Sequence, residues 1–268
     1  MAWVPNNMAT LYLLPNRIAD RPVEETIPTK TLDVLRSTRY FLAENAKSAR
    51  AYLKAAGHPL PIAELHIEEI GHRPDVQKIN SWLAPLSENH DVAIVSESGC
   101  PGIADPGADI VAVAQARGLT VKPLTGPSSV FLALMASGLD GQHFRFLGYL
   151  PIKEPERSEA LLAAERQSAR GETQIFIETP YRNTTFLEFL TQTLRNDTRI
   201  TVAQDLTGDA EFVRTRSAQD WRKDLPTLAK MPTIFCILAQ SRKATTKDTK
   251  PSFKHFKGKK EGSFWRQA

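Results

Sequence analysis

A polar, glycine-rich loop follows the most strand-like apolar run of this chain. Val92–Val95 is a short apolar run of the kind that forms a buried parallel strand, and Ser96–Gly107 cannot continue it. Three glycines in this loop permit backbone conformations that a Cβ forbids, so a ligand can approach the main chain. Loops beyond the carboxyl ends of strands bind small molecules in open α/β sheets. The glycine spacing fits neither the dinucleotide GxGxxG pattern nor a P-loop, so both nucleotide motifs are unsupported.

Carboxylates in this loop are the first candidates for chemistry. Glu97 and Asp105 could each hold a ribose hydroxyl, bind a cation or act as a base. The alternative is that they cap the amides of their own turn, as Asp and Ser often do. For Asp105, which precedes Pro106, we favour capping.

Other polar side chains stand where strands give way to helices. Ser128 and Ser129 begin an apolar helix, where unpaired amides attract a carboxylate or phosphate; plain capping is equally plausible. In the sequence ETPYR, Arg182 can bind phosphate as a bidentate donor or pair with Glu178. Lys153 is another candidate phosphate contact, with a solvated lysine as the favoured alternative.

Two common kinds of catalytic site have no support. The six histidines show no metal-ligand spacing, and no Cys/His pair forms a zinc signature. Ser98 is not in a GxSxG elbow, so serine hydrolysis has no motif behind it. Metal-free transfer chemistry with a ligand bound mainly by the backbone is the best fit.

Size and composition predict a protein with a packed core in a reducing compartment. The length of 268 residues favours two domains, although one large α/β domain remains possible, and an apolar fraction of 41% excludes global disorder. We find no run long enough to span a bilayer and no signal-peptide pattern. Two cysteines make neither a disulfide framework nor a metal site, so we expect a cytoplasmic protein.

The positive charge belongs to the C-terminal segment. The chain has a net charge of +4, but nine Lys and Arg residues against Asp248 and Glu261 give residues 242–268 a net charge of +7 and leave about −3 for residues 1–241. This polar, lysine-rich segment predicts a disordered tail when free. Its aromatic residues suit base stacking beside phosphate contacts, although a solvated tail without a partner is equally plausible.

Strand-like runs alternate with helical patterns, which predicts parallel βαβ construction. The predicted strands are Thr10–Leu14, Tyr40–Ala43, Leu65–Ile70, Val92–Val95, Leu119–Leu124, His143–Leu147, Thr173–Ile177, Arg199–Ala203 and Thr233–Leu238. The predicted helices are Thr31–Thr38, Ala46–Ala56, Pro74–Leu86, Asp109–Arg117, Val130–Ala136, Glu156–Gln167 and Arg182–Leu194. The break at residues 125–129 predicts an N-terminal α/β domain over 1–124, a second over 125–241 and the tail at 242–268.

Four polar loops each follow a strand-like segment, and in such a sheet they would meet in one cleft. They are Ser96–Gly107, Thr125–Ser129, Glu178–Arg182 and Asp205–Glu211.

The order of these segments resembles the tetrapyrrole-methylase superfamily of S-adenosylmethionine-dependent methyltransferases. Within it, the chain is most similar to the small-subunit ribosomal RNA 2′-O-ribose cytidine methyltransferase family. The likeness covers roughly residues 10–240 and is densest over VSESGCPGIADPG and the rest of residues 95–151, continuing in QIFIETPYRNTTFLEFL and ITVAQDLTGDAEFVRT.

The resemblance implies two α/β domains with S-adenosylmethionine in the cleft between them, in a homodimer that acts on RNA. By motif position, the donor would contact Ser96, Glu97, Ser98, Gly99, Pro101, Gly102, Ile103, Ser128, Ser129, Ala203 and Leu206. We expect Glu97, Glu178 or Asp205, unranked, to take the proton of a ribose hydroxyl, and Arg182, Lys153 and Tyr181 to contact RNA.

Departures from the family pattern keep other functions open. The first loop reads PNRIAD where the family has a glycine-containing turn close to ATPIGN, and SESGCP stands for SDAGTP. The early AEDTR becomes AENAK, with one carboxylate fewer. The alternatives are a methylase of another RNA site, a tetrapyrrole or a protein, and a non-catalytic module that binds the donor or RNA.

Overall fold

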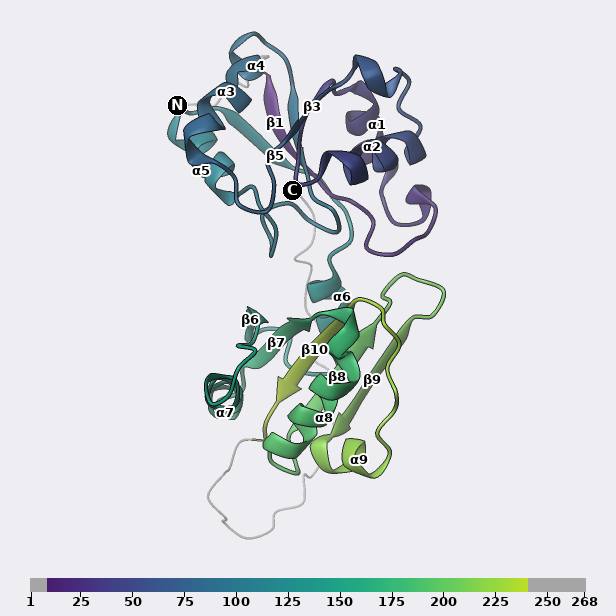
Figure 1. Ribbon diagram of the computed structural model, residues 1–268, viewed down its shortest axis with the longest axis vertical. Coiled ribbons are helices and arrows are strands. Elements are labelled where there is room, and N and C mark those ends of the chain that lie inside the picture. The colour runs from purple at the N-terminus through teal and green to yellow at the C-terminus, as the bar shows by residue number, and fades with distance from the viewer. Residues whose placement is uncertain (1–8, 241–268) are drawn as a thin grey trace, which may run out of the picture.

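The structure, a computed structural model, describes residues 9–240. They form two β-sheets with helices, the first from the N-terminal half of the chain and the second from the C-terminal half (Figure 1). The predicted basic tail at 242–268 lies outside the described residues. Within residues 9–240, no helix combines the length and apolar character needed to cross a membrane.

The first sheet is parallel throughout and has the strand order β3-β2-β4-β1-β5. Its strands are β1 (Thr10–Leu14), β2 (Tyr40–Ala43), β3 (His66–Glu69), β4 (Val92–Val95) and β5 (Thr120–Pro123). Strand β4 lies between β2 and β1, and its four residues are all buried. This confirms the central parallel strand that the apolar run predicted.

Helices cover both faces of the first sheet. Val92 and Ile94 face one apolar core, and Ala93 and Val95 face the other, as expected from the alternation of side chains along a strand. The longer helices are α1 (Thr29–Ser37), α2 (Ala46–Ala55) and α5 (Ala108–Ala116), with 3-10 turns η1 (Val23–Glu25) and η2 (Ile62–Glu64).

The segment predicted as one helix over Pro74–Leu86 is broken, and that prediction is wrong. It consists of η3 (Val76–Lys78), α3 (Ile79–Trp82) and α4 (Ala84–Ser87). Pro85 lies in the first turn of α4, where its missing N–H is tolerated, whereas a continuous helix would bring its ring against the preceding turn.

The second sheet corrects the prediction of parallel construction throughout. Its order is β6-β7-β10-β8-β9, and every neighbouring pair except β6 and β7 is antiparallel. The strands are β6 (Phe144–Tyr149), β7 (Thr173–Glu178), β8 (Arg199–Gln204), β9 (Phe212–Ser217) and β10 (Thr233–Leu238). Strand β9 was missed because its sequence, FVRTRS, carries two arginines and no apolar run.

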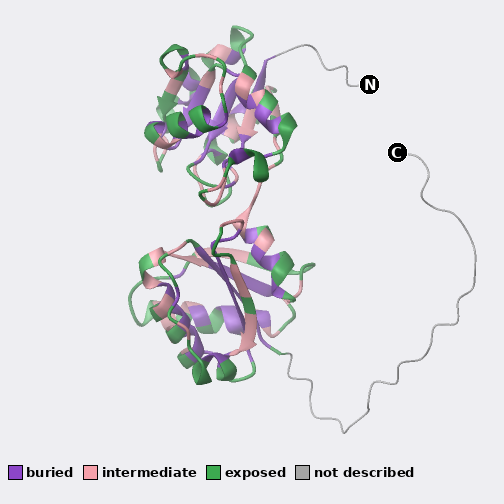
Figure 2. Ribbon diagram, turned by 90° about the vertical axis from the view of Figure 1, so that its right-hand side faces the viewer, coloured by how far each residue is buried: buried purple, intermediate pink, exposed green. Residues whose placement is uncertain are grey.

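Helices again lie on both faces of the second sheet (Figures 1 and 2). Helix α6 (Ser129–Ser137) packs on one face, where Val130, Ala133 and Leu134 meet strand residues such as Ile234. The other face is covered by α7 (Glu156–Ser168), α8 (Asn183–Thr193) and the short α9 (Ala218–Lys223), which sequence patterns did not predict.

The pairing of the second sheet brings four chain segments to one edge. Since β7 and β8 both run antiparallel to β10, they run parallel to each other, and their carboxyl ends meet where β10 begins. Strand β6 is parallel to β7 and ends there too. The edge therefore carries the loops after β6, β7 and β8, including the 3-10 turn η4 (Pro180–Arg182).

Candidate functional site

A pocket of about 320 Å³ lies between the two sheets and is lined by both halves of the chain. The β4 loop contributes Ser98, Gly99, Cys100, Ile103 and Asp105, and the start of α6 contributes Ser128 and Ser129. From the edge of the second sheet come Tyr149, Glu178, Ala203, Leu206 and Thr233. All four predicted loops therefore line this pocket, the loop after β8 through Leu206.

A buried asparagine joins the loop after β1 to the loop after β4. Asn16 and Gly99 exchange backbone hydrogen bonds of 2.8 and 3.2 Å. The Asn16 side chain also donates to the carbonyl oxygens of Ser96 and Glu97, at 3.1 and 3.0 Å. Gly99 has a φ of +71°, which favours glycine at this turn. Sequence reasoning missed Asn16, although a polar residue directly after the first strand was the available signal.

Four of the predicted donor contacts in the β4 loop lie outside the pocket. Ser96 is buried behind it, and the exposed Glu97 points toward Glu44 instead. Pro101 and Gly102 line a neighbouring apolar hollow with Leu13 and others. Residues of the β4 loop therefore line both the pocket and this neighbouring hollow, because the tight turns of the loop point successive side chains in different directions.

Asp105 lines the pocket, and the predicted capping is not seen: its carboxylate accepts no hydrogen bond from a turn amide in the described part of the chain. Burial raises the pKa of this carboxyl to about 7, and the carboxylates of Glu44 and Glu97 add to the increase. The buried Ser96 hydroxyl, which has no well-oriented partner among residues 9–240, faces Asp105 and partly opposes the increase, as does His72.

Glu44, the residue after β2, is an acid close to Asp105 that the sequence analysis did not include among the candidate site residues. Its side chain is only 6% exposed, and Oε1 lies 2.6 Å from Nδ1 of the exposed His72. Oε2 accepts the backbone N–H of Glu97 at 3.1 Å. Ligand atoms of Glu44, His72 and Glu97 lie within 4.8 Å of one another, but these hydrogen bonds already account for their approach, so we infer no metal role.

Glu178 faces the pocket in an ion pair. Its Oε1 accepts from Nη2 and Nε of Arg182, at 2.6 and 3.1 Å, and from the N–H of Thr179 at 2.5 Å. Of the two alternatives for Arg182, the structure shows pairing with Glu178. Tyr181 is 80% exposed, with the Lys230 ammonium 5.5 Å from its ring centroid, and Lys153 is exposed outside the pocket.

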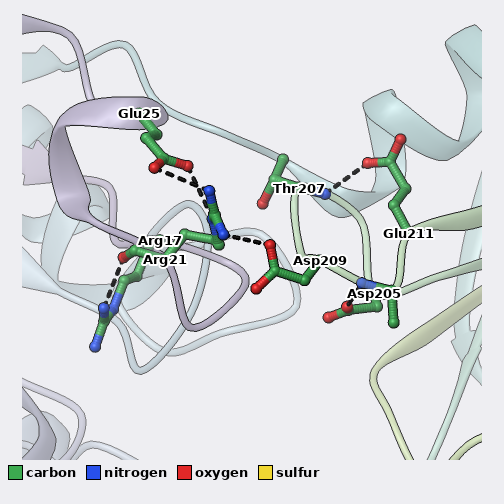
Figure 3. A network of polar contacts seen from close by, with 8 residues as sticks. Arg17, Arg21, Glu25, Asp205, Thr207, Asp209 and Glu211 are labelled. Atoms are coloured by element: carbon green, nitrogen blue, oxygen red, sulfur yellow. Dashed lines mark hydrogen bonds and ion pairs between the residues drawn. The ribbon is translucent and has the colours of Figure 1, made fainter.

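Asp205 lies beside the pocket and holds its own loop. It is buried, has a φ of +50°, and its carboxylate accepts the N–H of Ala210 at 2.9 Å (Figure 3). A Cβ on Gly208 would collide with this carboxylate, so the turn closes around it. Figure 3 also shows Arg21, from the loop after β1, paired with Asp209 from this loop, which joins the two halves.

The start of α6 is open to a ligand. Ser128 is the N-cap residue, but its side chain makes no capping hydrogen bond, so the predicted capping is not seen there. The amides of the first turn therefore remain without side-chain partners and can bind a carboxylate. Among the described residues that line the pocket, two are acids and none is Lys or Arg. Such a lining suits a ligand that carries a positive charge and apolar surface.

Comparison with known proteins supplies a family for this geometry. Residues 24–220 match the family described as Tetrapyrrole (Corrin/Porphyrin) Methylases. The chain is also 32% identical over 208 residues to the Ribosomal RNA small subunit methyltransferase I of Escherichia coli O157:H7, which covers 78% of this chain and 69% of that protein. The protein of the same name from Bacillus subtilis (strain 168) is 32% identical over 213 residues, which cover 78% of this chain and 68% of the relative.

A solved structure shares the fold. The crystal structure of the methyltransferase CobJ aligns with a TM-score of 0.56 at 20% sequence identity. The alignment covers 91% of this chain and 97% of that one, so the shared fold extends over both halves of the chain.

Proposed function

The chain belongs to the tetrapyrrole methylase family, and we propose that it methylates a ribose 2′-hydroxyl of small-subunit ribosomal RNA. S-adenosylmethionine is its methyl donor. The relatives named as small-subunit ribosomal RNA methyltransferases, which match this chain over more than three quarters of its length, carry the proposal of an RNA substrate. We further propose that the enzyme works in the cytoplasm, on RNA within or on its way to the small subunit.

The pocket between the sheets fits this donor. Its volume of about 320 Å³ lies in the range of ligand pockets, and Ile103, Ile234 and Leu206 offer apolar surface to an adenine ring. The amides at the start of α6, beside Ser128 and Ser129, suit the donor's carboxylate. Ser98 and the backbone of Gly99 and Ala203 complete the contacts that we propose.

The donor supplies an electrophilic methyl group bonded to a positively charged sulfur. The chain must hold the RNA hydroxyl in line with that group and exclude water from it. The described residues that line the pocket include no Lys or Arg, so no fixed cation repels the donor's positive sulfur. For the RNA, we propose that the exposed ring of Tyr181 stacks on a base, with Lys230 beside it as a phosphate contact. We propose that the exposed Lys153 contacts a phosphate too, and that Arg182, which pairs with Glu178 in the free protein, contacts RNA when it binds.

Donor binding can be tested with a charge placed in the pocket wall. Ile103 is 44% exposed and lines the pocket, so Ile103→Arg should fold normally and repel the sulfonium. We expect donor affinity to fall by about tenfold or more, a loss on the order of 1.4 kcal/mol, in calorimetric titration. Methyl transfer to small subunits from cells that lack this protein should fall with it.

The matched control is Val76→Arg, which adds the same charge at a residue that is 64% exposed and outside the pocket. Equal donor affinities for the two variants would contradict this placement of the donor. Label that appears in large-subunit RNA or protein instead of small-subunit RNA would contradict the proposed substrate.

We also propose that the enzyme is a homodimer. Phe131 and Met135 of α6 are 46% and 78% exposed, and Phe131 stacks edge-on against the exposed Phe144 of β6, with 5.9 Å between ring centroids. Tyr149, at the end of β6, and Ile152, in the loop that follows, are also exposed, by 59% and 69%. Large exposed apolar side chains that gather on neighbouring elements are typical of interfaces between subunits.

A further inference from the structure

Two acids line the pocket among the described residues, and only these have direct access to a hydroxyl bound there. They are Asp105, from the β4 loop, and Glu178, at the end of β7. Glu97 lies outside the pocket lining, and the Asp205 carboxylate is committed to the Ala210 amide. Two of the three acids expected from sequence to act as the base are therefore poorly placed.

Glu178 is already committed to an ion pair and to an amide. Its Oε1 is bound by the guanidinium of Arg182 at 2.6 Å and by the Thr179 amide. A carboxylate stabilised by a cation and an amide loses part of both interactions when it accepts a proton. Its ion pair therefore suits it to orient Arg182 toward the rim of the pocket.

Asp105 has the opposite surroundings. It takes part in no ion pair within residues 9–240, and the groups around its carboxylate are predominantly acidic. Glu44 and Glu97 raise its proton affinity, and His72 and the Ser96 hydroxyl oppose them. Cys100 also lies in the pocket wall, and burial together with the charge of Asp105 raises the pKa of its thiol. Across the pocket stands the Glu178–Arg182 pair. This balance of burial and like charge raises the pKa of Asp105 to about 7, close to working pH.

Asp105 also has a path to water. On its other side it lines an open hollow together with Glu44 and His72. Glu44 is buried and hydrogen-bonded to His72, whose side chain is 78% exposed. A proton taken up from the pocket by Asp105 can therefore leave without crossing the bound donor.

We propose that Asp105 is the base of the reaction and takes the proton of the RNA hydroxyl inside the pocket, a role that rests on the proposed function. As the hydroxyl oxygen bonds to the methyl carbon, its O–H bond breaks and the proton passes to the Asp105 carboxylate. The methyl–sulfur bond breaks at the same time and leaves its electron pair on sulfur, which becomes neutral. The neutral acid then releases its proton toward Glu44 and His72.

The test compares Asp105→Asn with the wild-type enzyme in single-turnover methylation of small subunits from cells lacking this protein, between about pH 5.5 and 9. Wild-type rates should rise through about pH 7 and then level off. Asp105→Asn should be slower by roughly 10²- to 10⁴-fold, without that rise and with donor affinity within about threefold of wild type. Asp105→Ala should regain part of its rate when formate is added, because formate can occupy the space of the lost carboxylate.

A second readout needs neither donor nor RNA. In protein with ¹³C-labelled aspartate carboxyls, the signal missing from Asp105→Asn should titrate near pH 7, and a midpoint near 4 would overturn the proposal. The matched control for activity is Asp33→Asn, on the exposed side of α1, which should keep the wild-type rate.

Two other results decide against the proposal. An Asp105→Asn enzyme with the wild-type rate and pH profile would show that Asp105 takes no proton. Donor affinity that falls in proportion to the rate would assign Asp105 to holding the donor instead. If wild-type enzyme labels no small-subunit RNA, the proposed substrate is wrong. The role of Asp105 is then decided by its carboxyl titration and by formate rescue of Asp105→Ala, measured with the true acceptor.

Discussion

At the scale of single residues, the environment of Asp105 has a cost in stability that can be measured without substrate. Its pKa is about 7 in the folded protein and near 3.9 in an unfolded chain, so between these pH values the folded protein holds a proton that the unfolded chain has released. The free energy of unfolding should therefore fall as the pH rises from 4 to 7. Asp105→Asn cannot ionise and should lack this fall.

We expect the variant to gain about 1 kcal/mol over wild type between pH 4 and pH 8, a modest value because the carboxyl is partly exposed and solvent screens its charge. Urea unfolding of both proteins at the two pH values measures this gain. Parallel stability curves would mean that the Asp105 carboxyl ionises in the folded protein as it does in the unfolded chain.

Sequence patterns indicated loops that line the pocket, but they left Glu97, Glu178 and Asp205 unranked and favoured a capping role for Asp105. Asp105 before Pro106 has the local pattern of a turn cap, and nothing nearby in sequence signals that Glu44, 61 positions earlier, approaches it. Glu97 is adjacent to pocket residues in the chain, yet the turn points it toward Glu44. Side-chain direction in a loop and charge from distant elements are three-dimensional properties, which spacing does not encode.

At the scale of elements, one glycine allows the segment between the two halves to pass the loop after β1. A Cβ on Gly126 would overlap the ring of Pro15. Pro15 cannot retreat easily because the buried Tyr52 hydroxyl donates to its carbonyl oxygen at 2.8 Å. Gly126→Ala should therefore lower the free energy of unfolding by about 1–3 kcal/mol, as overpacking does.

The matched control is Gly141→Ala, where an added Cβ meets nothing within 4 Å and φ is not positive. This variant should unfold within about 0.5 kcal/mol of wild type. Thermal and urea unfolding of both variants tests the comparison, and equal stabilities would mean that Pro15 moves aside at little cost.

Strand positions were easier to predict than strand directions. Apolar runs such as Val92–Val95 and Thr233–Leu238 predicted β4 and β10 with their observed bounds. The same runs could not show that β10 enters the second sheet antiparallel to both neighbours, because side-chain burial is alike in either direction. The loops after β7 and β8 nevertheless lie at the same edge of the sheet, as predicted, because both strands run antiparallel to β10 and therefore parallel to each other.

At the scale of the whole molecule, the apolar surface of α6 and β6 should decide the oligomeric state. Met135 of α6 is 78% exposed, so Met135→Glu places a charge where the proposed partner subunit would bury it. We expect light scattering with size-exclusion chromatography to give a dimer for wild type and mainly monomer for the variant.

The control is Val76→Glu, at a residue that is 64% exposed on η3 in the first half of the chain. This variant should remain dimeric. A wild-type monomer at micromolar concentration would contradict the proposed homodimer, as would a Met135→Glu protein that dimerises like wild type.

The direction of β10 determines where the described part of the chain ends. The strand starts at Thr233 in the pocket wall and ends at Leu238, about 17 Å away at some 3.4 Å per residue. The chain therefore departs from the far edge of the second sheet. The pocket and Gln240, the last residue that the structure describes, therefore lie at opposite edges of the second sheet, so a probe attached to Gln240 should leave donor binding unchanged.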